Sequence, residues 1–102
     1  MAFRLAYHPA VSDEDLPGIP VKDKVRLHRA LQERISRQPA RFGKPLRHTL
    51  RGLWVYRVGD YRIVYAVRQC EVWVLKIGHR RDVYQRMEAR MRTMEQWSEQ
   101  QP

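Results

Sequence analysis

The middle of the chain carries short, mostly apolar runs rich in β-branched and aromatic residues and bounded by turn residues, a pattern typical of strands. Four such runs follow one another: LRHTL, LWVYRV, YRIVYAVR and VWVLKIG. Their separators are Arg51-Gly52, Gly59-Asp60 and Gln69-Cys70-Glu71. Connections this short predict an antiparallel meander. A further run, FRLAYH at residues 3–8, predicts a first strand that Pro9 ends.

Two other segments have helical periodicity. Pro20 suits the first turn of a helix, and apolar residues recur at helical spacing until Pro39, so we predict an amphipathic helix over residues 20–37. Asp82 and Gln85 have the spacing of a capping box, and the apolar positions that follow predict a second helix over residues 82–98. The segments between these elements are expected to be loops.

The predicted order is β-α-β-β-β-β-α, which indicates an α+β fold. We expect a four- to five-stranded, mainly antiparallel sheet with the helices packed on one face. The length of 102 residues favours one domain over residues 1–102, and 43% hydrophobic with 30% charged residues is a globular composition. No apolar run approaches the ~20 residues of a spanning helix, and a single cysteine, Cys70, fits a reducing cytoplasm.

The positive charge of the chain is concentrated in one segment. The whole chain carries a formal charge of +9, and residues 41–81 hold ten lysines and arginines against two acidic residues, a net of +8. Such a concentrated field attracts polyanions, with nucleic acid first, an acidic protein second and a membrane surface third. A solvated basic surface without a specific target is the alternative.

The Gly59-Asp60 turn fixes a register that places two arginines across from each other. A two-residue loop with glycine first indicates a type II′ hairpin, so Arg57 should face Arg62 on the side of the sheet away from the core. Like charges in this position cost roughly 0.2–1 kcal/mol, which suggests a bound anion. Neutralisation by Asp60, Glu71 or solvent is the alternative reading.

More basic groups should arrive at the same end of the sheet. If the next hairpin turns at Gln69-Cys70, Arg62 falls near Ile77, and the residues GHRR at 78–81 lie beside the first turn. The N-terminus of the predicted second helix would add a potential suited to phosphate. Tyr84, near that N-terminus, could stack on a base or simply pack on the sheet edge.

Two stretches, LRGLWVYRVGDYRIVYAV and VLKIGHRRDVY, resemble the RelE/ParE toxin superfamily, and specifically its RelE-type ribosome-dependent messenger-RNA interferases. The resemblance extends over roughly residues 3–85. It implies functional roles for an arginine after the hairpin tyrosine, an arginine near the end of the last strand and a tyrosine shortly after it, which match Arg62, Arg80 and Tyr84. Arg57 matches a position that is commonly lysine in the family.

The lysines proposed as proton acceptors in well-known members are absent, since Val55 and Arg57 occupy that strand. Arginine is a poor base because its pKa exceeds about 12, whereas histidine has an unperturbed pKa of about 6.5. His79 is therefore the expected general base. The expected catalytic set is Arg57, Arg62, His79, Arg80 and Tyr84, with neither a metal nor another cofactor.

The resemblance also implies substrate and partners. The substrate would be messenger RNA on the ribosome, cut by attack of its own 2′-OH. A wider RNA-binding surface is expected at Lys44, Arg47, Arg51 and Arg81. A cognate antitoxin would bind the toxin in a hetero-oligomer in the cytoplasm, without a membrane. The alternatives are a ParE-like gyrase inhibitor, a catalytically inactive antitoxin-binding module, and a basic structural domain that binds any polyanion.

Overall fold

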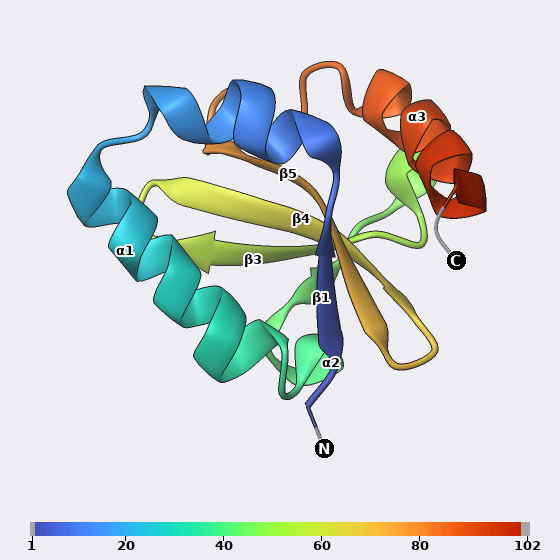
Figure 1. Ribbon diagram of the computed structural model, residues 1–102, viewed down its shortest axis with the longest axis horizontal. Helices are drawn as coiled ribbons and strands as arrows, with labels where there is room; N and C mark the ends of the chain where they lie inside the picture. Colours follow the sequence, from blue (N-terminus) through green and yellow to red (C-terminus); the bar gives the residue numbers. More distant parts are fainter. Residues whose placement is uncertain (1, 101–102) are drawn as a thin grey trace.

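The structure is a computed structural model that describes residues 2–100, with side chains described up to residue 94 (Figure 1). Residues 1, 101 and 102 of the expected domain lie outside the described part. The strands are β1 Arg4–Tyr7, β2 Lys44–Pro45, β3 Trp54–Val58, β4 Tyr61–Arg68 and β5 Glu71–His79. The α-helices are α1 Val21–Ala30, α2 Pro39–Phe42 and α3 Met87–Gln100. Short helical turns are η1 Val11–Asp15, η2 Leu16–Gly18, η3 Leu31–Ile35 and η4 His48–Leu50.

The strands form one five-stranded sheet in the order β1-β5-β4-β3-β2. The pair of β1 and β5 is parallel and the other three pairs are antiparallel. The predicted α+β class, the element order and the mainly antiparallel sheet are therefore confirmed. None of the helices in the described part is long and apolar enough to cross a membrane.

Helices cover both faces of the sheet, so the expectation that they pack on one face is wrong. On one face, Leu27 of α1 and Ile35 of η3 pack against Ile63 in the first core cluster. On the other face, Met87 and Met94 of α3 belong to a second core cluster. The physical reason is that β4 and β5 are apolar at consecutive positions. Both faces of the sheet therefore carry apolar side chains, and each face needs a helix to bury them.

The first predicted helix is confirmed, since α1 continues into the turn η3. Of the positions that recur at helical spacing, Val21, Val25, His28, Leu31 and Ile35, only Leu31 and Ile35 are buried. Val21 and Val25 are 73% and 53% exposed, whereas Leu27 is buried. Leucine buries more apolar area than valine, which favours the helix rotation that places the leucine-containing stripe against the sheet.

The second predicted helix begins five residues late. Residues 80–86 form turns, Arg86 has a φ of 60°, and α3 starts at Met87. The backbone N–H of Val83 donates to the C=O of His79 at 2.9 Å, and Val83 is completely buried. Because Val83 enters the second core directly after β5, the chain turns inward there, and the predicted capping box does not begin the helix.

Two other segments, one predicted as a strand and one as a loop, differ from their predictions. The run LRHTL contains the 3-10 helix η4 instead of a strand, and His48 has a φ of 59°. Leu46 and Leu50 both pack against the second core cluster, and the positive φ of His48 between them is incompatible with a regular strand. The segment after β1, expected to be a loop, forms the turns η1 and η2.

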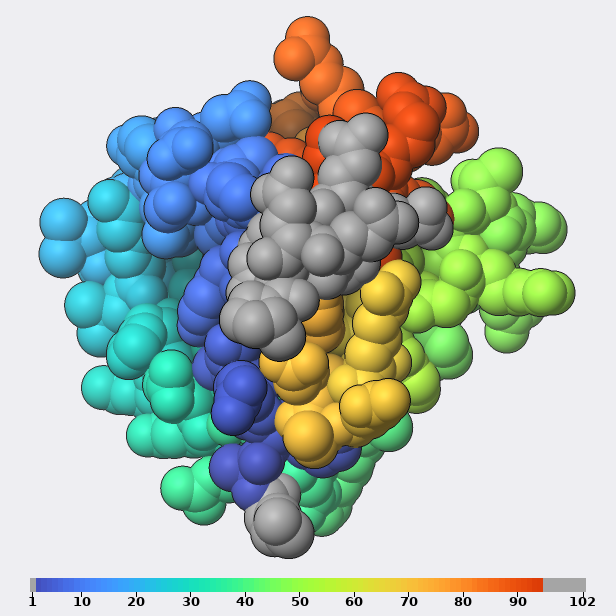
Figure 2. All heavy atoms as spheres, turned by 45° about the vertical axis from the view of Figure 1, so that its right-hand side comes forward, coloured from blue at the N-terminus to red at the C-terminus, as the bar shows by residue number. Residues whose placement is uncertain are grey.

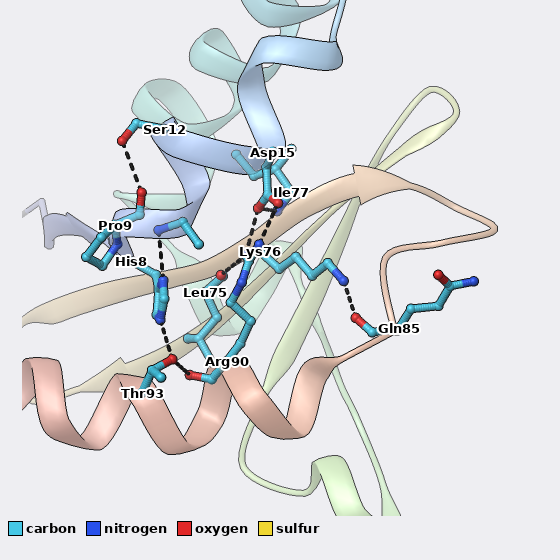
Figure 3. A network of polar contacts seen from close by, with 11 residues as sticks. His8, Pro9, Ser12, Asp15, Leu75, Lys76, Ile77, Gln85, Arg90 and Thr93 are labelled. Carbon is cyan, nitrogen blue, oxygen red and sulfur yellow. Dashed lines mark hydrogen bonds and ion pairs between the residues drawn. The ribbon is translucent and has the colours of Figure 1, made fainter.

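A buried ion pair joins η1 to α3 beside the edge of β5 (Figure 3). Asp15 Oδ1 lies 2.8 Å from Arg90 Nη2, and the two side chains are only 7% and 11% exposed. Asp15 Oδ2 also accepts the backbone N–H of Ile77, and Arg90 donates to the C=O of Leu75. β1 pairs with β5 only as far as Val74. Beyond that residue the Asp15 carboxylate accepts a backbone N–H of β5 that a neighbouring strand would otherwise accept.

Candidate nucleic-acid interface

The predicted register of the β3–β4 hairpin is confirmed. Arg57 pairs with Arg62 and Val58 pairs with Tyr61 across the turn. Gly59 has a φ of 59°, as the first position of a type II′ turn requires. The residues that alternate with Arg57 and Arg62 along the two strands all belong to or pack against the first core cluster: Trp54, Tyr56, Val58, Tyr61, Ile63, Tyr65 and Val67. The two arginines therefore point to the opposite face.

Arg62 is already held in place by the hairpin. Its Nη1 donates to the backbone C=O of Gly59 at 3.1 Å and of Tyr61 at 2.9 Å. Both bonds use one nitrogen of a guanidinium that carries five N–H donors, so the same side chain can hold the turn and an anion at once. Arg57 is exposed on the neighbouring strand.

The end of β5 reaches the same turn, as expected (Figure 1). The backbone N–H of Arg80 donates to the C=O of Asp60 at 2.8 Å. The pairing differs from the prediction by one residue, because Arg62 lies opposite Gly78 and not Ile77. A register shift between Val64 and Tyr65 inserts one extra residue into β5. The hairpin and the loop after β5 thus bring Arg57, Arg62 and Arg80 to one end of the sheet.

His79 is not brought to the arginine pair. It lies opposite Tyr61, and the two rings meet edge to face with centroids 6.0 Å apart, which puts His79 on the face of the first core. Its Nδ1 accepts the backbone N–H of Arg81 at 3.3 Å. In the neutral ring this bond assigns the proton to Nε2, so the free side of the ring is a donor.

His79 also lines an open hollow of about 670 Å³ that lies between β5, η1 and α3. Lys76 lines it too, and its Nζ donates to the backbone C=O of Gln85 (Figure 3). Burial, followed by the nearby Arg90, lowers the pKa of Lys76. Lys76 pairs with Val64, two positions along β4 from Arg62, so its position in β5 is on the same face of the sheet as Arg62.

Tyr84 lies in the turns before α3 and is 43% exposed. It lines a small hollow of about 250 Å³ together with Thr49 and Leu50 of η4. The segment that contains η4, green in Figure 2, stands out from the surface beside the C-terminal segment. Tyr84 is therefore adjacent to the turn whose flanking residues are Arg47 and Arg51.

The expected RNA-binding residues are exposed: Lys44, Arg47, Arg51 and Arg81. Lys44 pairs with Val55, so it lies at the free edge of the sheet on the strand next to Arg57. In the described part of the chain there is no group of three or more His, Cys, Asp or Glu side chains that could hold a metal ion.

The sequence analysis missed Arg26 as a neighbour of the hairpin. A Cβ built at Gly59 would lie 3.0 Å from Arg26 Nη1, so a guanidinium of α1 rests against the turn. The only signal in the sequence is a pair of arginines three residues apart, Arg26 and Arg29, and helical spacing alone does not say which strand the helix crosses.

Comparison with known proteins identifies the group to which the chain belongs. Residues 12–84 match the family described as ParE toxin of type II toxin-antitoxin system, parDE. Two Mycobacterium tuberculosis proteins are similar in sequence. Toxin RelG is 43% identical over 54 residues, which are 51% of this chain and 62% of RelG. Toxin RelE is 39% identical over 64 residues, which are 60% of this chain and 66% of RelE. The chain thus spans just under two thirds of each relative.

Solved structures agree. The toxin-antitoxin complex RelBE2 from Mycobacterium tuberculosis matches with a TM-score of 0.73 and 27% identity, over 78% of this chain and 99% of that chain. The protein HP0894 from Helicobacter pylori has the same fold, with a TM-score of 0.58 and 17% identity, over 76% of this chain and 93% of that chain. From the family match and these relatives, the chain belongs to the RelE/ParE superfamily, the toxins of type II toxin-antitoxin systems.

Proposed function

We propose that the protein is an endoribonuclease that cuts messenger RNA on the ribosome, using the 2′-OH of the RNA and no metal. The observation that carries the proposal is the end of the sheet where Arg57 lies directly opposite Arg62 and the backbone of Arg80 is bonded to the intervening turn. Three guanidinium groups from neighbouring segments suit a phosphate, because their planar forks match its oxygens.

The chemistry needs alignment and charge stabilisation more than it needs a protein nucleophile. The 2′-oxygen attacks the phosphorus, the bond to the 5′-oxygen breaks, and the products are a 2′,3′-cyclic phosphate and a 5′-hydroxyl. Arg57 and Arg62 would bind the phosphoryl oxygens, where negative charge grows in the transition state. Arg80 would stabilise the leaving 5′-oxygen, which takes its proton from solvent water, and Tyr84 would stack on or orient the nucleotide.

The proton of the 2′-OH requires an acceptor, and His79 is poorly disposed for that role. Its ring packs against Tyr61 on the opposite face from Arg62, and its Nδ1 is occupied by the Arg81 N–H. We therefore assign the role of proton acceptor to a group that the ribosome supplies.

Replacing His79 with alanine is therefore expected to slow cleavage less than about tenfold, because a lost general base would cost 100-fold or more. The measurement is the single-turnover rate on ribosomes carrying messenger RNA. His28→Ala, which changes an exposed histidine on α1, is the matched control. A loss of 100-fold or more for His79→Ala alone would restore His79 as the base.

The wider surface and the partners follow from the same proposal. Lys44, Arg47, Arg51 and Arg81 would bind the backbone of the messenger or ribosomal RNA, since all four are exposed. A cognate antitoxin in the cytoplasm would bind the toxin in a hetero-oligomer. The similarity to the RelBE2 toxin-antitoxin complex supports this partner.

The experiment that tests the function adds purified protein to ribosomes programmed with a defined messenger RNA and maps the new ends by primer extension. We expect cleavage within the codon exposed on the ribosome, 5′-hydroxyl products, and little cleavage of the same RNA without ribosomes. Intact messenger RNA after incubation with active ribosomes would refute the proposal.

A second candidate is inhibition of DNA gyrase, which the match to the ParE toxin family favours. The arginines at the hairpin argue against it, because a protein that acts only by binding gyrase does not need three guanidinium groups converging on one turn. A supercoiling assay with gyrase separates the two functions. Loss of supercoiling together with intact messenger RNA would support the gyrase inhibitor. Unchanged supercoiling by gyrase together with intact messenger RNA would indicate an inactive antitoxin-binding module.

A further inference from the structure

A second cluster of arginines lies on the helix side of the same hairpin. Arg26 and Arg29 of α1, Arg34 of η3 and Arg57 of β3 line one hollow of about 260 Å³. Its other lining residues are Ala30, Glu33, Val58 and Gly59. The residues that line the hollow thus include four arginines and one acidic residue, Glu33.

Two features hold these arginines at the hollow. Arg34 Nη1 donates to the hydroxyl of Tyr56, which fixes its head group over β3. The Arg26 guanidinium approaches Gly59 so closely that a Cβ there would lie 3.0 Å from Nη1 and 3.4 Å from Cζ. Glycine at this turn therefore satisfies the positive φ and also leaves room for a cation.

The acidic groups nearby do not balance this charge. Asp23 Oδ1 lies 3.8 Å from Arg26 Nη1, a long contact to a side chain that is 52% exposed, and Glu33 is also exposed. Four cations that share a small hollow repel one another, and a single anion bound among them would relieve the repulsion of all four.

The size and position of the hollow indicate which anion would bind. A hollow of about 260 Å³ is smaller than the roughly 300–1,000 Å³ of pockets that hold a whole drug-sized ligand, so one phosphate group fits better than a nucleotide. Arg57 lines the hollow and also lies directly opposite Arg62. The hollow is therefore continuous with the arginine pair.

We propose that Arg26, Arg29, Arg34 and Arg57 form a second phosphate site, which binds the backbone phosphate of a single RNA strand next to the phosphate held at Arg57 and Arg62. This inference rests on the proposed function and extends it. The strand would cross the β3 edge near Gly59, with one phosphate on each side of Arg57. The helix side of the hairpin thus sets the path of the RNA, while the sheet side carries the chemistry.

The test measures binding alone, so it is scored separately from cleavage. The probe is a fluorescent single-stranded RNA with 2′-O-methyl groups throughout, which cannot be cut by its own 2′-oxygen, and the readout is anisotropy over a range of salt concentrations. For the double variant Arg26→Ala with Arg29→Ala we expect about tenfold weaker binding. The slope of log K against log salt should fall in magnitude by about 0.7, the value for one phosphate on a single strand.

The matched control is Lys22→Ala with Arg37→Ala, which removes the same charge from exposed positions near the two ends of the same helical segment. It should bind like the wild type, and Arg26→Lys with Arg29→Lys should restore the salt slope because it restores the charge. Thermal melting verifies that each variant is folded. Equal weakening by the alanine pair and the control pair would overturn the site.

A polyglutamate peptide of the same charge as the RNA tests whether the site prefers phosphate. The Arg26→Ala/Arg29→Ala variant should lose more affinity for RNA than for the peptide. An equal loss for both would overturn the assignment to a phosphate, and would indicate a general attraction to acidic chains. Both results keep their meaning if the protein fails to cut messenger RNA.

Discussion

Arg62→Ala is expected to lower the single-turnover rate of messenger-RNA cleavage by about 100- to 1,000-fold, the usual cost of removing one donor to a developing negative charge. Arg62 is well placed for this role because its Nη1 is fixed by two backbone carbonyls of the hairpin. A donor that is held in position before the reaction stabilises the transition state without reorganisation. Arg80→Ala should produce a loss of similar size.

The control for this prediction is Arg37→Ala, which removes one exposed arginine near the opposite end of the sheet, where the adjacent Ser36 C=O accepts the N–H of Phe3. It should cut at the wild-type rate. Arg62→Lys should fall between alanine and wild type, because lysine keeps the charge and loses the planar fork. Wild-type cleavage by the double variant Arg62→Ala with Arg80→Ala would remove both residues from the catalytic site.

Asp15→Ala is expected to lower the free energy of unfolding by about 3–5 kcal/mol, the cost of breaking a buried ion pair by removing one partner. Arg90 would keep its charge with only 11% of its side chain exposed, and the backbone N–H of Ile77 would lose its acceptor. Urea denaturation measures the change. A decrease in Tm of more than about 10 °C should accompany it.

Asp13→Ala is the matched control because it changes an exposed carboxylate in the same turn, η1. It should alter the free energy of unfolding by less than about 0.5 kcal/mol. A decrease below about 1 kcal/mol for Asp15→Ala would mean that the ion pair does not secure α3 to the sheet.

The hairpin could be predicted from the sequence because the residues that determine its turn and register are neighbours in the chain. Gly59 supplies the positive φ of the turn, and a two-residue loop at Gly59-Asp60 allows only one register for the strands on either side. The pairing of Arg57 with Arg62 follows from these two facts. The helical cover on the second face could also have been predicted, since β4 is apolar at five consecutive positions, residues 63–67.

The position of His79 could not be predicted, because it depends on one inserted residue in β5. Without the register shift, Ile77 would lie opposite Arg62 and His79 would share its face. The bulge places Gly78 opposite Arg62 and turns His79 toward Tyr61 on the other side. A one-residue slip exchanges the faces of every later side chain, and the residues where the shift falls, Val74 to Lys76, include no glycine that would indicate a bulge.

The start of α3 was mispredicted for a related reason. Asp82 and Gln85 have the right spacing for a cap, but the burial of Val83 decides the path of the chain. Long-range packing determines this boundary, and the local pattern does not contain it. The contact between Arg26 and the hairpin is equally long-range, since it depends on how α1 crosses β3.

The central claim is that this end of the sheet promotes attack by the 2′-OH of the RNA. Its most direct test is a messenger RNA with a single 2′-deoxynucleotide at the mapped cleavage position, loaded on ribosomes and compared with the all-ribose RNA. We predict that the all-ribose RNA is cut and that cleavage at the substituted position disappears. Cleavage of the deoxy-substituted RNA at the same bond and rate would contradict the account, because the nucleophile would then come from elsewhere.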